Sequence, residues 1–341
     1  MKAFSLERYG EPLVLKEVPD PVPGEGEVVV RVRACGICGT DLKIAKGALS
    51  SIVTLPHVPG HEIAGDIAAI GPGVRGLSVG DRGAVYFYLP CGDCRPCRSG
   101  RGNICERVTR LGFERAGGFA DYVKLPASSF CRSETGLAYE SLAVLPDALL
   151  TSYHAVATIG RLREGERILI VGAGGLGVHA VQFARHLGAA VAVCDPRPES
   201  LALAASLGAD LLLPGLSAET TARLRAWTGG AGVDLVIEGS GNGDTFAAAL
   251  HALGRGGRLV IMGYDTSRPH PLDSMAMHYN EWTVSGSRVG TMSELRDVMG
   301  LVERGIIRTV ISTVLPMSEL NAGLALLAKG GAPGRIVLEN A

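Results

Sequence analysis

A glycine-rich turn in the middle of the chain restricts the possible folds more than any other feature. An apolar run at 168–171, typical of a buried strand, leads into Gly172-Ala-Gly174-Gly175-Leu176-Gly177, and helical periodicity covers 175–187. The pattern then alternates, with strands expected at 190–194, 233–238 and 258–262 and helices at 199–207 and 244–253. Strands that alternate with helices in this way predict an α/β domain with a doubly wound parallel sheet.

The turn has the G-x-G-x-x-G spacing of a dinucleotide-binding loop. Gly172 would permit the tight turn, Gly174 would let the backbone approach a pyrophosphate, and Gly177 would allow close packing of the helix on the strand. The phosphates would then lie at the positive N-terminus of that helix, beside Gly175 and Leu176. A plain structural turn is the alternative, but the preceding strand and following helix favour a dinucleotide.

An acidic residue follows the next expected strand. Asp195 lies 23 residues after Gly172, where a carboxylate accepts hydrogen bonds from the adenosine ribose diol. The same carboxylate would repel a 2′-phosphate, so the sequence favours NAD over NADP. Arg197 keeps NADP open, because an arginine near this position can accommodate the phosphate.

The residues before about 145 show a different sequence pattern. Short β-like runs at 28–33, 63–70, 82–88 and 119–125 are separated by Gly/Pro turns, which predicts an irregular, mostly antiparallel β domain. The tail from Gly290 contains two helical stretches and a last strand at 335–339. We expect a first domain at 1–150, a dinucleotide-binding domain at 151–288 and a C-terminal segment at 289–341.

Four of the eight cysteines fall between Cys91 and Cys105, with Cys94 and Cys97 between them. Two-residue spacings let successive thiolates converge on one ion, and four thiolates close a tetrahedral Zn²⁺ shell, as in structural zinc sites. An iron–sulfur cluster or a pair of disulfides would be the alternatives. The spacing and a reducing compartment favour zinc.

Charge and hydropathy exclude several other classes. The 33 Lys and Arg residues nearly balance the 34 Asp and Glu residues, which argues against nucleic acid and anionic membranes as partners. The longest uncharged stretch, 168–184, contains a histidine, a glutamine and several glycines, so no membrane-spanning helix is expected. Without a signal peptide, the chain is expected in the cytoplasm, where cysteines stay reduced.

Cys38, His61, Glu62 and Asp147 are scattered, and their spacing alone does not join them. Together with three other stretches, however, the segments that carry Cys38 and His61 resemble the zinc-dependent medium-chain alcohol dehydrogenase family, in the family's order and over nearly the whole chain. The matching segments are 36–41 (GICGTD), 59–62 (PGHE), 91–105, 172–177 and 334–337 (GRIV). The resemblance implies a GroES-like first domain with both zinc sites, completed by the C-terminal segment, and a Rossmann domain that binds NAD.

The resemblance also implies roles for single residues. Cys38, His61 and Asp147 would hold a catalytic zinc, and Glu62 could approach the same ion. Asp147 falls where many members have cysteine and others have a carboxylate. Three ligands leave a fourth position for water or substrate, as catalytic zinc requires. Asp41 would orient His61.

Other positions are assigned to the cofactor and to proton transfer. By resemblance, Thr40 bonds the alcohol oxygen, Thr151 lines the nicotinamide and Arg335 binds the pyrophosphate. Lys43 stands where the family often has the outer histidine of a proton relay, and lysine at its ordinary pKa is a poor base at neutral pH.

These features predict an enzyme that transfers hydride reversibly between an alcohol, secondary or broad-range, and NAD. It would use two zinc ions per chain, one catalytic and one structural, and form a homo-oligomer, a tetramer or a dimer. A polyol or threonine dehydrogenase of the same family is the alternative. A zinc-free quinone or enone reductase and a catalytically silent NAD- or zinc-binding protein are the competing classes.

Overall fold

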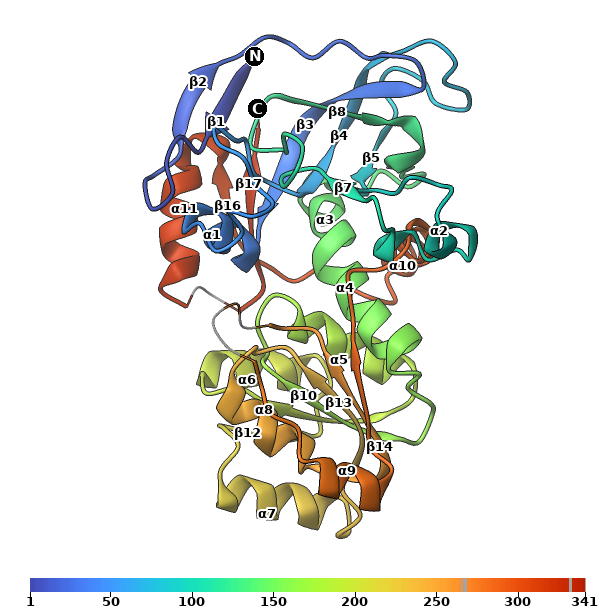
Figure 1. The fold of residues 1–341 in the computed structure, drawn as a ribbon, viewed down its shortest axis with the longest axis vertical. Coiled ribbons are helices and arrows are strands. Elements are labelled where there is room, and N and C mark those ends of the chain that lie inside the picture. Colours follow the sequence, from blue (N-terminus) through green and yellow to red (C-terminus); the bar gives the residue numbers. More distant parts are fainter. Residues whose placement is uncertain (265, 267–268, 331–332, 341) are drawn as a thin grey trace. The chain divides into compact units, whose positions relative to one another are not determined.

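The computed structural model describes residues 1–264, 266, 269–330 and 333–340. The chain forms two compact units (Figure 1): residues 1–147 with 291–341 make up unit 1, and residues 148–290 make up unit 2. The chain enters and leaves unit 2 within three residues of the expected limits, 150 and 288.

Unit 2 is built on a six-stranded sheet in which every neighbouring pair is parallel, so the predicted doubly wound sheet is confirmed. The strands lie in the order β12-β11-β10-β13-β14-β15. The order reverses between β10 and β13, and ligands of such sheets bind beyond the carboxyl ends of the strands at that point. The elements of unit 2 are α4 (Leu150–Tyr153), η4 (His154–Ile159), β10 (Arg167–Val171), α5 (Gly177–His186), β11 (Ala190–Cys194), α6 (Pro198–Ser206), β12 (Leu211–Leu213), α7 (Ala218–Trp227), β13 (Val233–Glu238), α8 (Gly243–Leu250), β14 (Leu253–Ile261), α9 (Ser274–Asn280) and β15 (Thr283–Gly286).

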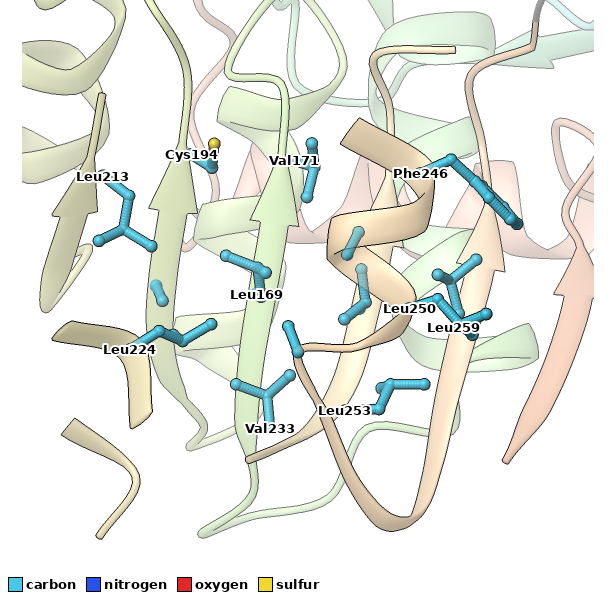
Figure 2. Close-up of a cluster of buried hydrophobic side chains, with 14 of the residues drawn as sticks. Leu169, Val171, Cys194, Leu213, Leu224, Val233, Phe246, Leu250, Leu253 and Leu259 are labelled. Atoms are coloured by element: carbon cyan, nitrogen blue, oxygen red, sulfur yellow. The ribbon is translucent and has the colours of Figure 1, made fainter. Parts of the chain in front are cut away.

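Alternation along β10 gives each face of the sheet its own helices. Leu169 and Val171 belong to a buried cluster with Leu224 of α7 and Leu250 of α8 (Figure 2). Ile170 points to the other face, where a Cβ built on Gly177 of α5 would lie 3.5 Å from its Cγ2. Both faces are thus apolar, which explains why the buried strands read as continuous hydrophobic runs.

Unit 1 contains a sheet in which β3 is the central strand. The order is β16-β17-β3-β4-β5-β9, and β8 also pairs with β3. The β16–β17 pair is parallel and all other pairs are antiparallel. The strands of unit 1 are β1 (Lys2–Ser5), β2 (Val14–Glu17), β3 (Glu27–Ile37), β4 (Glu62–Ile70), β5 (Arg82–Val85), β6 (Tyr88–Leu89), β7 (Thr109–Arg110), β8 (Tyr122–Pro126), β9 (Phe130–Arg132), β16 (Ile311–Pro316) and β17 (Arg335–Glu339).

The C-terminal segment contributes two of these strands, and β17 pairs directly with β3 (Figure 1). Residues 335–339 therefore belong to the same sheet as residues 27–37. The helices of unit 1 are α1 (Gly39–Ala45), α2 (Arg95–Arg98), η1 (Gly102–Ile104), η2 (Ala127–Ser129), α3 (Tyr139–Val144), α10 (Met292–Glu303), η5 (Met317–Glu319) and α11 (Leu320–Ala328), and η3 (Leu145–Leu149) continues α3 into unit 2.

The helical stretch 139–159 is long and apolar enough to cross a membrane by length and composition alone. Its most apolar window is 78% buried within the protein. A core helix passes the same test, so this stretch is weak evidence for a membrane span.

Several elements differ from the expectations. The run expected at 82–88 is two strands, β5 and β6, and the run at 119–125 begins as a strand only at Tyr122. Helix α5 begins at Gly177 rather than Gly175, because the intervening residues form the turn. The short strands β12 and β16 and helix α7 were not predicted, since their sequences lack a clear period.

Candidate functional sites

Four side chains from three separate segments of unit 1 meet in one buried cluster. Cys38, His61, Glu62 and Asp147 each offer a ligand atom within 4.8 Å of the others. Asp147 Oδ2 lies 3.4 Å from Cys38 Sγ and 3.8 Å from His61 Nε2. Donor atoms around a tetrahedral zinc ion lie roughly 3.3–3.8 Å apart, given metal–ligand distances of about 2.0–2.3 Å. The cluster therefore has the donor types and spacing that zinc requires.

The start of α1 holds Cys38 and His61 in place together. Cys38 is the N-cap of α1, and its backbone N–H donates to Asp41 Oδ2 at 2.8 Å. The other oxygen of this buried carboxylate faces His61 Nδ1 at 3.4 Å. Nε2 is then the ring nitrogen left for a metal, which is the usual arrangement around a ligating histidine.

Asp147 comes from an irregular turn in the long helix. Residues Leu145–Leu149 form a π-helical turn, and Pro146 within it has no N–H for the regular helical ladder. Such turns frequently occur at functional sites. Although burial raises it, the pKa of the Asp147 carboxyl is held well below its usual range by the hydrogen bond from His61 and the charge of Arg335. Asp147 is therefore an anionic donor.

Arg335 lies inside this cluster, a position that the resemblance did not suggest. Its Nη2 is 2.7 Å from Asp147 Oδ2 and 2.8 Å from Glu62 Oε1, and the arginine side chain is only 6% exposed. The guanidinium compensates two buried carboxylates. The structure thus gives Arg335 two carboxylate partners in unit 1, in addition to the pyrophosphate expected from the resemblance.

Glu62 packs so closely that its neighbour must be glycine. Gly36 on β3 is paired with Glu62 on β4, and a Cβ at Gly36 would lie 2.0 Å from Glu62 Oε2. Burial raises the pKa of the Glu62 carboxyl well above its usual value, against the opposing charge of Arg335. Gly36 therefore makes room for a carboxylate behind the other three donors.

Two aromatic residues that the sequence analysis missed enclose His61. The rings of Phe87 and Phe113 lie 5.0 Å and 5.3 Å from the imidazole, measured between centroids. They remove the histidine from water on those sides. Burial would lower the pKa of His61, but the Asp41 carboxylate and the hydrogen bonds with Asp147 and Cys38 raise it well above its usual value. No local sequence signal connects these aromatic residues with His61.

The residues assigned to proton transfer lie on the same helix. Thr40 is on the first turn of α1, with its hydroxyl oxygen 3.7 Å from Cys38 Sγ. Lys43 lies one turn later and is partly exposed. Thr40 is thus next to the donor cluster, as a proton-transfer role would require.

The four-cysteine lobe has the geometry of a closed metal site. The sulfur of Cys91 lies 3.9 Å from that of Cys97 and 3.4 Å from that of Cys105, and the sulfurs of Cys94 and Cys105 are 3.8 Å apart. Tetrahedral ZnS₄ places sulfurs about 3.8 Å apart, whereas a disulfide requires about 2.05 Å. All eight cysteines are free thiols, so the disulfide alternative is wrong for this structure.

Local donors prepare this lobe for thiolates. The backbone N–H groups of Cys91 and Arg107 both donate to Cys105 Sγ at 3.3 Å. Although burial raises it, backbone N–H groups and neighbouring thiols lower the pKa of Cys94 to about 6, whereas burial and the neighbouring thiols raise the pKa of Cys97 to about 12. Four sulfurs at these distances fill a tetrahedral shell and leave no position for a substrate.

The glycine loop of unit 2 has the conformation that its spacing predicts. Gly172 adopts φ +92°, a left-handed conformation that favours glycine. A Cβ at Gly177 would lie 1.8 Å from the carbonyl oxygen of Gly172, so the helix start touches the turn. Among the residues that the structure describes, the atom nearest to a Cβ at Gly174 would be Nη2 of Arg197, at 3.8 Å. Gly174 therefore leaves the open face that a pyrophosphate needs.

The remaining cofactor positions, apart from Arg335 of unit 1, also lie in unit 2. The carbonyl of Leu176 accepts a hydrogen bond from Ser152 Oγ at 2.8 Å, and that of Gly175 lies 2.8 Å from His179 Nδ1, which fixes the loop to two helices. Thr151 is buried on α4. Asp195 follows β11 and accepts a hydrogen bond from Ala173 N at 2.8 Å. The loop and the acidic residue are therefore in contact, as the fingerprint predicts.

Comparison with known proteins agrees with this arrangement. Residues 24–134 match the model of the alcohol dehydrogenase GroES-like domain, and residues 175–304 match the zinc-binding dehydrogenase model. An alcohol dehydrogenase of Geobacillus stearothermophilus is 36% identical over 341 residues, covering 99% of both chains. The chain belongs to the zinc-dependent medium-chain alcohol dehydrogenase family.

Other members of the family match over the same length. An L-threonine 3-dehydrogenase of Bacillus licheniformis is 33% identical over 346 residues, covering 99% of this chain and 98% of the relative. The crystal structure of an NAD-dependent alcohol dehydrogenase is 32% identical with a TM-score of 0.92, covering 99% of each chain. The predicted combination of a GroES-like domain and a Rossmann domain is confirmed.

Proposed function

We propose that this protein is a zinc-dependent dehydrogenase that transfers hydride reversibly between an alcohol and NAD, with secondary or broad-range alcohols as substrates. The observation that carries the proposal is the convergence of Cys38, His61 and Asp147 in one buried cluster. A second unit of the same chain supplies a dinucleotide-binding turn. The donors are a thiolate, an imidazole and a carboxylate. The negative charges of the thiolate and the carboxylate balance the two positive charges of a divalent metal ion.

The metal stoichiometry that we propose is two zinc ions per chain. Cys38, His61 and Asp147 would hold the catalytic ion, with Glu62 as a nearby reserve donor, and the Cys91–Cys105 lobe would hold the structural ion. A zinc ion with an open position lowers the pKa of a bound alcohol and polarises a carbonyl.

The protein's own residues position the donors and handle the proton. Asp41 Oδ1 lies 3.4 Å from Nδ1 of His61, on the side of the ring away from Asp147, which would leave Nε2 for the metal. Thr40 would hydrogen-bond the alcohol oxygen and start the exit of its proton, passing its own hydroxyl proton toward the nicotinamide ribose; its hydroxyl lies beside the Cys38 thiol. Phe87 and Phe113 exclude water from the His61 ring.

For the cofactor, we propose that NAD binds along the turn from Gly172 to Gly177. Gly174, Gly175 and Leu176 would face the pyrophosphate, and Asp195 would accept hydrogen bonds from the adenosine ribose diol. Thr151 would line the nicotinamide pocket, and Arg335 would contribute to binding of the pyrophosphate. NAD is preferred over NADP because Asp195 is buried and anionic.

A threonine dehydrogenase is the second candidate function, and the threonine-specific relative in Bacillus licheniformis favours it. Threonine carries a secondary alcohol, so the same metal chemistry would apply. Rates with L-threonine, a polyol and a simple secondary alcohol, measured under the same conditions, separate the two candidates.

We also propose a cytoplasmic location and an oligomeric state for the protein. Free thiols at all eight cysteines suit the reducing cytoplasm. We propose a homo-oligomer, either a tetramer or a dimer, and light scattering on the purified protein distinguishes the two. The partner in the reaction is a small alcohol or carbonyl compound.

The proposal is tested with Cys38→Ser and Asp147→Asn. Both variants should lose most alcohol-dependent NADH formation and about one zinc per chain, while the affinity for NADH stays near that of the wild type. Cys131→Ala is the matched control, because Cys131 is a buried thiol of the same unit outside both clusters. Near-normal turnover in Asp147→Asn would contradict the ligand assignment, and absence of turnover with every alcohol in the wild type would contradict the function.

A further inference from the structure

The acidic residue of the cofactor site is already saturated with hydrogen bonds. Asp195 Oδ1 accepts from the backbone N–H of Arg197 at 2.9 Å and from its Nε at 3.0 Å. Asp195 Oδ2 accepts from Ala173 N at 2.8 Å and from Arg197 Nη2 at 3.0 Å. A carboxylate offers about four lone-pair sites. A ribose diol can therefore reach Asp195 only by displacing donors that are present.

The four donors differ in how easily they move. The N–H groups of Ala173 and Arg197 belong to the backbone of the turn and of the α6 N-cap. The other two belong to the Arg197 side chain, which is 31% exposed. The ribose diol brings two O–H donors, the same number that the guanidinium would withdraw. If the Arg197 side chain rotates away, the two O–H groups of the ribose diol can replace its two N–H donors at the Asp195 carboxylate.

Arg197 also lies against the open face of the loop. Its Nη2 is 3.8 Å from the position of a Cβ on Gly174. Val171 and Cys194, which precede Gly172 and Asp195, are paired in register and lie at the carboxyl ends of adjacent strands (Figure 2). The guanidinium is therefore at the same edge of the sheet as both the turn and the acid.

The ion pair changes the charge that a cofactor meets. Asp195 alone would repel a 2′-phosphate, but Arg197 neutralises it at contact distance. Glu199 on the first turn of α6 is an acidic group that also acts on Arg197. A guanidinium binds phosphate oxygens through two parallel N–H groups, which is a strong form of ionic hydrogen bonding.

We propose that Arg197 determines cofactor choice: it gives way to the ribose diol of NAD and pairs with the 2′-phosphate of NADP, so that the site accepts both. This inference rests on the proposed dinucleotide site and deepens it. NAD remains the tighter ligand because Asp195 still carries its charge. The ratio of the NAD affinity to the NADP affinity is therefore much smaller than it would be if Asp195 had no arginine beside it.

The test is a fluorescence titration of the zinc-loaded protein with NADH and with NADPH. The wild type should bind both, and Arg197→Gln should weaken NADPH binding by about tenfold or more, since a charged hydrogen bond is lost. NADH affinity should change by less than about threefold, because the ribose diol of NADH binds Asp195 without needing Arg197, and the variant leaves that carboxylate accessible. Thermal melting of each variant verifies that unit 2 is folded.

Arg185→Gln is the matched control. Arg185 forms an ion pair with Asp210 at 3.1 Å in the same unit, but Asp210 precedes β12 and Arg185 lies in the last turn of α5, so the pair is at the amino ends of the strands. This variant should leave both affinities unchanged.

The outcomes separate the inference from the function on which it rests. Equal weakening of NADH and NADPH in Arg197→Gln would overturn the inference, because Arg197 would then only hold Asp195 in place. NADPH binding that is undetectable in the wild type, or unaffected by Arg197→Gln, would also overturn it and leave NAD binding intact. A wild type that binds neither cofactor would refute the proposed dinucleotide site itself.

Discussion

Replacing Gly177 with alanine would force the dinucleotide-binding turn to move. The added Cβ would lie 1.8 Å from the carbonyl oxygen of Gly172, well inside contact distance, and that oxygen belongs to the backbone and cannot rotate away. Overpacking of this kind costs about 1–3 kcal/mol. Gly177 is helical, a conformation that alanine also adopts. The substitution therefore offsets about 0.4–1 kcal/mol of this loss, because alanine lowers the conformational entropy of the unfolded chain. A net loss of about 1–2 kcal/mol would lower the melting temperature of a domain of this size by roughly 3–8 °C.

Gly174→Ala provides the matched comparison, because the nearest atom to its Cβ in the described part of the chain is at the flexible end of Arg197, 3.8 Å away. We expect Gly174→Ala to melt within about 1 °C of the wild type and yet to bind NADH at least tenfold more weakly, since the methyl group occupies the pyrophosphate face. Gly177→Ala should lose both stability and NADH affinity. Calorimetry and NADH fluorescence measure the two effects. Equal stability in both variants, or unchanged NADH binding in Gly174→Ala, would refute this account of the turn.

Three further variants test unit 1. Cys94→Ser should lower the melting temperature and remove about one zinc per chain without changing NADH affinity; full metal content by elemental analysis would exclude the lobe as a zinc site. Arg335→Gln leaves the buried Asp147 carboxylate without its cation and Glu62 without its Arg335 contact, and should cost about 3–5 kcal/mol in the metal-depleted protein. Urea unfolding measures this loss, and a loss below about 1 kcal/mol would contradict the pairing. Gly36→Ala should destabilise the protein by at least about 1 kcal/mol, because its Cβ would lie 2.0 Å from Glu62 Oε2; a melting temperature equal to that of the wild type would be inconsistent with this packing.

Local motifs allowed much of the molecule to be predicted from sequence. The glycine turn, its strand and its helix are contiguous, so a short window contains all the constraints that form them. The same is true of the Cys91–Cys105 lobe, where spacing alone brings the thiols together. Asp195 could be assigned because parallel strands end at one edge of the sheet.

Contacts between distant residues could not be predicted in this way. Arg335 and Asp147 are 188 positions apart in sequence, and nothing local to either indicates their ion pair. The packing of Phe87 and Phe113 around His61 also depends on how separate strands meet. Only the family resemblance joined the scattered metal donors, and it assigned Arg335 to a different partner.

Short elements were missed for a different reason. Strand β12 has three residues and β16 alternates weakly between partly buried and exposed positions, so neither shows a clear hydrophobic period. Both are edge strands of their sheets. Edge strands are fixed by backbone pairing with a neighbour rather than by burial of their own side chains, which leaves little trace in the sequence.

The central claim is that Cys38, His61 and Asp147 hold one zinc ion in unit 1. Anomalous diffraction at the zinc absorption edge from crystals of the zinc-loaded protein tests it most directly. The account predicts a peak about 2.0–2.3 Å from Cys38 Sγ, His61 Nε2 and an Asp147 carboxylate oxygen, besides a second peak among the four lobe sulfurs. A fully loaded protein with no anomalous peak among those three side chains, or with a peak that excludes Asp147, would contradict it.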